Sequence, residues 1–170
     1  EQSDGETNYK RAWELLETTP ACHEDHVEVL RRRLICKPEN ESEADQKRSV
    51  RWARTLVEAE PHDIINWLSL GWAVESLEGE PAAVDILREA IRRHGPDFTL
   101  YYSLASHLCS LAKLDEAKEA MLLALQEDIF ASSSALESEC FAPIWGYIEE
   151  LKQSDWFHKQ KERLEIRLRS

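Results

Sequence analysis

Hydrophobic and polar positions repeat with a period of 34 residues in the middle of the chain. Residues 64–97 align with residues 98–131 without a gap, and apolar or small residues coincide at seven places. The matching pairs are Trp67 with Tyr101, Leu70 with Leu104, Gly71 with Ala105, Val74 with Leu108, Ala83 with Ala117, Leu87 with Met121, and Ala90 with Ala124. Self-similarity at a fixed period predicts an array of like structural units.

The spacing inside each unit predicts two antiparallel helices. Large and apolar residues recur three and four positions apart, which places them on one helical face. The small residues allow two helix backbones to approach closely, and the large ones fill the space beside them. Asp63 and Asp97 stand where N-caps are wanted, Pro81 suits the first turn of a second helix, and Gly95-Pro96 ends one. A single helix pair cannot bury its apolar face alone, so we expect the pairs to stack.

This pattern resembles the tetratricopeptide repeat (TPR). Its units carry an aromatic residue or Leu, then Leu with Gly or Ala, further apolar and Ala positions, and a closing Pro. Residues 64–97 match nearly throughout, and residues 98–131 match except that Ile129 stands at the place of the closing proline. The resemblance implies an all-α fold, namely a right-handed superhelical array of antiparallel helix pairs (a TPR-like α-solenoid) with about eight or nine helices.

The repeat weakens toward the N-terminus. Residues 24–63 are expected to form a degenerate repeat, in which Arg33 stands at the aromatic position and Lys37 at the small one. An amphipathic pattern predicts one helix before it, over residues 6–19. Together with the following units, these segments predict a single TPR-like domain over residues 1–170.

A serine-rich stretch breaks the period after the second good unit. Residues 136–169 then predict two helices, the first with a boundary or kink near Pro143 and the second with an N-cap at Ser154. These helices do not follow the TPR spacing. Because the last apolar face of an array needs a cover, we interpret them as a C-terminal cap.

The charge balance narrows the classes of partner. The chain has 170 residues and a formal net charge of −12, and residues 61–130 hold 12 acids but only 5 bases. Such a surface repels phosphate backbones, which argues against nucleic-acid binding, and it favours basic partners. The four cysteines form no C-x-x-C pair, and no long apolar run or signal peptide occurs. These features favour a reducing compartment and no membrane, hence the cytoplasm, although the start at Glu1 leaves export open.

Candidate chemistry is sparse. Cys22-His-Glu-Asp-His26 gathers metal-binding residue types, but the histidines are three positions apart, whereas the zincin motif needs four. An acidic first helical turn explains the segment equally well. No Gly-rich phosphate loop and no G-x-S-x-G motif is present. We therefore expect no metal, no cofactor and no catalytic activity.

The resemblance implies a binding site in the concave groove of the TPR units, lined by their first helices. The groove positions in this chain are Ile65, Leu68, Trp72, Glu75, Thr99, Tyr102, Ser106 and Cys109. Trp72 and Tyr102 are expected to be aromatic anchors for a partner. The alternative is that a loop or the capping helices cover them. Some TPR domains bind the acidic tails of chaperones through cationic and amide side chains in the groove. The matching positions of this chain have no cationic or amide side chain, which argues against binding of carboxylate tails.

Scaffolding is the function that these observations favour. The chain is expected to be a non-catalytic adaptor that binds another protein or a peptide of apolar or basic character. Alternatives are a small acidic chaperone that holds an apolar or basic client, and a non-catalytic domain of a larger enzyme. Self-association into a homodimer is a further alternative for the groove.

Overall fold

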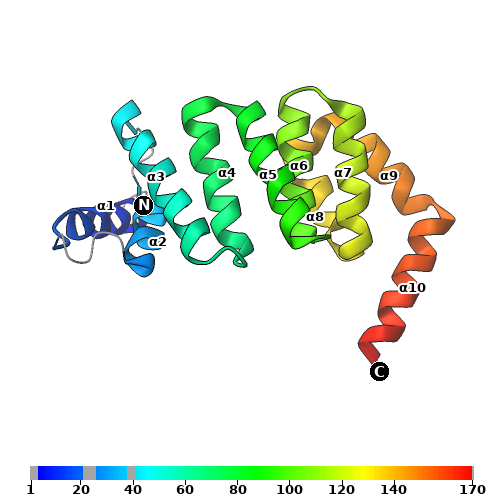
Figure 1. Ribbon diagram of the computed structural model, residues 1–170. Helices are drawn as coiled ribbons and strands as arrows, with labels where there is room; N and C mark the ends of the chain where they lie inside the picture. Colours follow the sequence, from blue (N-terminus) through cyan, green and yellow to red (C-terminus); the bar gives the residue numbers. More distant parts are fainter. Residues whose placement is uncertain (1–3, 21–25, 38–40, 170) are drawn as a thin grey trace. The chain divides into compact units, whose positions relative to one another are not determined.

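All regular elements in the computed structural model are helical. It describes residues 4–20, 26–37 and 41–169, with side chains over 11–20, 26–37 and 41–166. Ten α-helices and two short 3₁₀-helices, and no strand, occur in these residues (Figure 1). The all-α prediction is confirmed, whereas the superhelical TPR architecture stays a prediction. The chain divides into two compact units, residues 1–86 and 87–170, and each is described by itself.

The helices follow one another with short connections. The first unit holds α1 (Asp4–Glu17), α2 (Val27–Cys36), α3 (Glu43–Ala59) and α4 (Ile64–Glu78), and α5 (Glu80–His94) crosses the boundary. The second unit continues with α6 (Phe98–Ser110), α7 (Leu114–Glu127), η2 (Ile129–Ala131), α8 (Ser132–Glu137), η3 (Glu139–Ile144), α9 (Trp145–Gln153) and α10 (Asp155–Arg169).

The 34-residue period is visible in the helix boundaries. Helices α4 and α6 begin 34 residues apart, and so do α5 and α7. The predicted N-caps are confirmed, because the Asp63 carboxylate accepts a hydrogen bond from the Ile65 N–H at 3.0 Å and that of Asp97 from the Leu100 N–H at 3.1 Å. Gly95 ends α5 with φ 82°, a conformation that a side chain disfavours.

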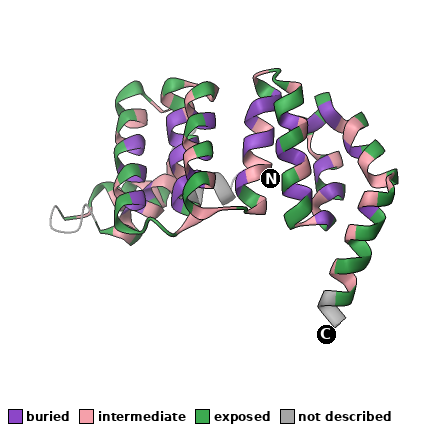
Figure 2. Cartoon of the chain, turned by 45° about the vertical axis from the view of Figure 1, so that its right-hand side comes forward, coloured by how far each residue is buried: buried purple, intermediate pink, exposed green. Residues whose placement is uncertain are grey.

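The core of the first unit joins α1, α2 and α3. Leu30, Trp52 and Leu56 form a buried cluster, and Trp13 of α1 packs against it, with its ring 6.1 Å from that of Trp52. Figure 2 shows the buried residues as stripes along the helices. Such stripes are the three-dimensional form of the apolar periodicity in the sequence.

Arg33 fills the place that an aromatic residue takes in the repeat pattern. It is 6% exposed, and its guanidinium carbon lies 5.1 Å from the centroid of the Trp52 ring. The guanidinium also donates a hydrogen bond to the Leu16 carbonyl at 3.1 Å, which ties the end of α1 to α2. A flat cation on an aromatic face is a stable arrangement. Lys37, at the position of the small residue, is the C-cap of α2, and its ammonium group lies 2.9 Å from a Glu41 carboxylate oxygen.

The turn between α3 and α4 is held by side chains of α4. Asn66 is buried and donates hydrogen bonds to the carbonyls of Leu56 and Glu60, each at 3.2 Å. The Trp67 indole donates to the Pro61 carbonyl at 3.0 Å. The Leu56 carbonyl also accepts a hydrogen bond from the Glu60 N–H at 2.9 Å, so the Asn66 amide adds a second bond to the end of α3. The turn therefore fixes α3 and α4 as an antiparallel pair (Figure 1).

The second unit is built on the α6–α7 pair. Ala105 and Ala117, both predicted at close-approach positions, have no exposed surface. The two helices pack closely along their length, as side chains of this size allow.

The number of helices departs from the expected eight or nine. The serine-rich break itself forms α8 over Ser132–Glu137, and a 3₁₀-helix follows that contains Pro143. Because proline lacks an N–H and disfavours helix in the residue before it, an α-helix resumes only at Trp145. The predicted N-cap at Ser154 is confirmed, since its hydroxyl accepts a hydrogen bond from the Phe157 N–H at 3.2 Å.

The close approach of α6 and α7 gives a stability test. Ala117→Leu is expected to lower the free energy of unfolding by about 1–3 kcal/mol, because the larger side chain overpacks a site without free space. Glu119→Leu on the exposed side of α7 is the matched control and should change stability by less than about 0.5 kcal/mol. Urea denaturation followed by circular dichroism measures both. Equal effects from the two variants would contradict the assigned packing.

Candidate functional site

Helix α4 exposes two large apolar side chains, whereas most of its other apolar side chains are buried. Ile65 is 59% exposed and Trp72 is 54% exposed, and both were predicted as groove residues. They are seven positions apart, which is close to two helical turns, so they lie on the same face. Leu68, predicted with them, is 3% exposed and belongs to the core, and Glu75 is half-buried. We call the surface made by Ile65 and Trp72 the α4 face.

The remainder of α4 explains why this exposure is unusual. Trp67, Leu70, Ala73 and Val74 are all buried, so α4 is apolar nearly all round. A helix of this character is normally enclosed by protein on all sides. The α4 face is the part of that apolar surface that the residues of the first unit leave in contact with solvent.

The equivalent positions on α6 are in a different environment. Thr99 is exposed, Tyr102 and Ser106 are half-buried, and Cys109 is 5% exposed. The Tyr102 ring lies 4.7 Å from that of Phe141, edge to face, and 5.2 Å from that of Phe98. Phe141 belongs to η3 and has no exposed surface. The alternative that the C-terminal segment covers Tyr102 therefore describes the structure, and we call η3 the α6 cover.

The α6 cover changes the acidity of the groups beneath it. Burial raises the pKa of the Cys109 thiol to about 11, and the neighbouring Cys140 contributes in the same direction. Burial likewise raises the pKa of Tyr102, although a hydrogen bond to Ser138 partly opposes this shift. Both groups stay neutral near pH 7, so this region offers a partner neither a thiolate nor a phenolate.

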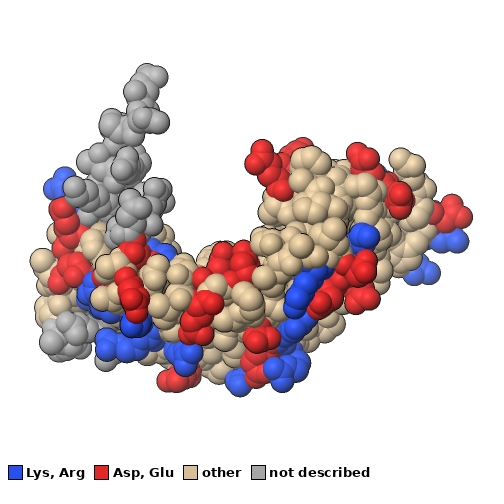
Figure 3. Space-filling model, turned by 90° about the horizontal axis from the view of Figure 1, so that it is seen from above, with Lys and Arg blue, Asp and Glu red and all other residues tan. Residues whose placement is uncertain are grey.

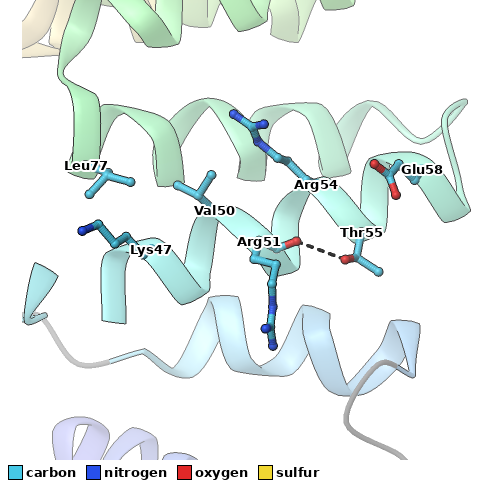
Figure 4. Close-up of a pocket in the computed structure, with 7 residues that line it drawn as sticks. All are labelled: Lys47, Val50, Arg51, Arg54, Thr55, Glu58 and Leu77. Carbon is cyan, nitrogen blue, oxygen red and sulfur yellow. Dashed lines mark hydrogen bonds between the residues drawn. The ribbon is translucent and has the colours of Figure 1, made fainter. Parts of the chain in front are cut away.

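The first unit has a cavity that was not predicted from the sequence. An open cavity of about 440 Å³ is lined by residues of α3 and by one leucine of α4 (Figure 4). Its lining residues are Lys47, Val50, Arg51, Arg54, Thr55, Glu58 and Leu77. The signal was present in the sequence, because the three cations recur at four and then three positions, the spacing of one helical face.

The structure describes only His26 of the Cys22–His26 segment, for which an acidic helix start was weighed against metal binding. Residues 22–25 lie outside the described residues. His26 is the N-cap of α2, and its Nδ1 accepts a hydrogen bond from the Glu28 N–H at 3.3 Å. This contact fits the interpretation of a helix start.

Comparison with protein-family models, curated proteins and solved structures gave no match for this chain. Among the helices described, none has both the length and the apolar character that crossing a bilayer requires.

Removal of the Phe141 ring tests the α6 cover. Phe141→Ala is expected to lower the free energy of unfolding by about 3–5 kcal/mol and to speed labelling of Cys109 by a thiol reagent, because the ring fills a closed space. Phe130→Ala is the control, since Phe130 is 47% exposed. Mass spectrometry of labelled peptides distinguishes Cys109 from the exposed Cys140. Unchanged labelling of Cys109 in a folded Phe141→Ala variant would contradict the cover.

The raised pKa of Cys109 predicts a loss of stability in alkali. Above its ordinary value of 9.0 the thiol ionises in the unfolded chain, whereas in the folded chain it stays neutral up to about pH 11. The unfolded state then binds fewer protons, so stability falls as the pH rises from 9 to 11. Urea titrations across this range should show a shallower fall for Cys109→Ala than for the unchanged chain. Parallel curves would show that Cys109 is not the group responsible.

Proposed function

We propose that the chain is a non-catalytic protein-interaction module that binds a peptide or a partner protein through the α4 face. The observation that carries the proposal is the exposure of Trp72 on α4, a helix most of whose apolar side chains are buried. Tryptophan is enriched among the residues that dominate binding energy, because its burial removes a large apolar area from water. The 34-residue spacing of α4 to α7 supports the TPR resemblance, and with it a scaffold or adaptor role.

The partner that fits this face is apolar with neutral or basic flanks. Ile65 and Trp72 offer apolar contact, and the segment around them, residues 61–130, has a net charge of −7 from its 12 acids and 5 bases. Opposite charge on a partner would speed its approach more than it would tighten the complex. Such a role places the chain in the cytoplasm or a similar reducing compartment, in line with its free thiols.

The predicted groove residues on α6 are expected to contribute less to partner binding than those on α4. Cys109 is buried and Tyr102 is half-buried against Phe141, so both offer a partner less surface than Trp72 does. Thr99 and Ser106 are polar and contribute little apolar area. We therefore assign the anchoring contacts to Trp72 and Ile65.

Site-specific photocrosslinking tests the α4 face. A benzoylphenylalanine placed at Trp72 is expected to crosslink one partner from the native extract, whereas the same group at Ile166 should not. Ile166 is the matched control, because it is 63% exposed on α10. Equal crosslinking from both positions would remove the basis for the proposal.

The partner identified in this way then gives a quantitative test. Trp72→Ala is expected to weaken its binding by about 30-fold, the effect of an interface anchor worth about 2 kcal/mol. Phe130→Ala should change the affinity less than about twofold, since an exposed aromatic residue outside the interface contributes nothing. Analytical ultracentrifugation of the chain alone shows whether the captured partner is a second copy. A Trp72→Ala affinity within twofold of the original would exclude the α4 face.

A further inference from the structure

Helix α3 carries a stripe of three cations on one exposed face. Lys47, Arg51 and Arg54 follow one another at intervals of four and three residues, and all three side chains are exposed. Glu58, four residues after Arg54, lies on the same face near the end of α3. Its negative charge marks the end of the run of cations. We call Lys47, Arg51 and Arg54 the α3 cationic stripe.

Two of these cations have no carboxylate partner within the part of the chain that the structure describes. Arg31 pairs with Glu60 and Asp63, Arg32 with Glu28, and Arg48 with Asp45. No such ion pair is formed by Arg51 or Arg54 with the side chains described, those of residues 11–20, 26–37 and 41–166. Figure 3 shows carboxylates interspersed with cations on one face of the molecule. In a chain with 33 acids and 21 bases, two adjacent unpaired arginines are a local excess of positive charge.

Lys47 is held only weakly. Its ammonium group lies 2.6 Å from a carboxylate oxygen of Glu43, one turn earlier on α3. Both side chains are more than 60% exposed, at 62% and 73%, so water screens the pair and its contribution to stability is small. Lys47 can therefore turn toward another anion without a large loss.

Apolar side chains lie beside the α3 cationic stripe. Val50 is 7% exposed, and together with Leu77 of α4 it lines the cavity of about 440 Å³ beside the cations. Figure 4 shows Lys47 next to Leu77, whereas the guanidinium groups of Arg51 and Arg54 diverge from the helix. A volume of this size holds one or two apolar side chains, with charged groups at its rim.

We propose that the α3 cationic stripe is a second docking surface, and that its occupant is an acidic segment of a partner protein with an apolar residue between its carboxylates. Arginine guanidinium groups pair with carboxylates through two parallel hydrogen bonds. Because the two guanidinium groups diverge, they suit two carboxylates of one segment rather than a single anion. The apolar residue between them would contact Val50 and Leu77 in the cavity.

The charge of the molecule favours a peptide over a nucleic acid. A net charge of −12 repels an extended phosphate backbone, whereas a segment with few carboxylates meets only the local positive field. Glu58 would repel a further carboxylate at the end of α3, which limits the length of the acidic segment. This surface is independent of the α4 face, and its preference for charge is the opposite one.

Fluorescence anisotropy with a synthetic peptide tests the proposal. The probe is a fluorescein-labelled twelve-residue peptide in which Glu pairs flank single Leu residues, titrated with the full chain at low salt. Arg51→Gln/Arg54→Gln is expected to weaken its binding by about tenfold or more, because two charge-assisted contacts are lost. The matched control is Arg92→Gln/Arg93→Gln, which removes the same charge from α5, where both arginines pair with Glu89. This control should weaken binding by less than about twofold.

Two further peptides separate the contribution of the carboxylates from that of the apolar residue. A peptide with Gln in place of Glu should lose binding, and one with Ser in place of Leu should bind several-fold more weakly. In ¹H–¹⁵N spectra of the unchanged chain, the Glu–Leu probe should shift the side-chain Nε–H signals of Arg51 and Arg54, so the test does not depend on the variant's folding.

Other outcomes overturn the proposal. Equal losses in the two double variants would show a non-specific charge effect. Absence of binding to the unchanged chain would show that no acidic segment docks there. Self-association that Arg51→Gln/Arg54→Gln abolishes, measured by sedimentation without peptide, would assign the stripe to a second copy of the chain instead.

Discussion

Each pair of helices in this protein has an apolar surface larger than the pair itself can bury, and the structure depends on how that surface is covered. In the first unit, α1 supplies a cover, because Trp13 packs against Trp52 in the cluster that α2 and α3 form. In the second unit, the cover over α6 is η3, with Phe141 fully enclosed against Tyr102. Neither cover follows the repeat pattern, because a cover needs one apolar side and one side that tolerates water.

The same constraint explains the departures from the repeat in residues 24–63. Arg33 has a long apolar stem and a flat cation, so it packs on Trp52 almost as an aromatic residue would, while its guanidinium reaches the Leu16 carbonyl. A polar group is tolerated in this place because it has a partner there. Arg33 thus joins α1 to α2 through the hydrogen bond that its guanidinium donates to the Leu16 carbonyl.

Local features were predictable from the sequence, and long-range ones were not. The helix starts at Asp63 and Asp97 and the break at Pro143 depend on neighbouring residues, so they could be assigned directly. The exposure of Trp72 followed from its place in the repeat. The cover over Tyr102 could be offered only as an alternative, since it depends on where a segment almost 40 residues later folds back. The spacing of Lys47, Arg51 and Arg54 was visible in the sequence, but whether Arg51 and Arg54 form ion pairs depends on the three-dimensional arrangement of the described side chains.

The attachment of η3 to the same chain as α6 has a consequence for competition. A segment tethered to its own site competes with free ligands at an effective concentration set by the connection between them. A free peptide with the same contacts would have to exceed that concentration to displace Phe141 from Tyr102. In the second unit, η3 thus occupies the face of α6 that a partner would contact. Among the described residues of the first unit, no segment occupies the α4 face at Trp72 in this way. A partner's choice between α4 and α6 therefore depends on which helix the chain itself already covers, and not only on the side chains of the two helices.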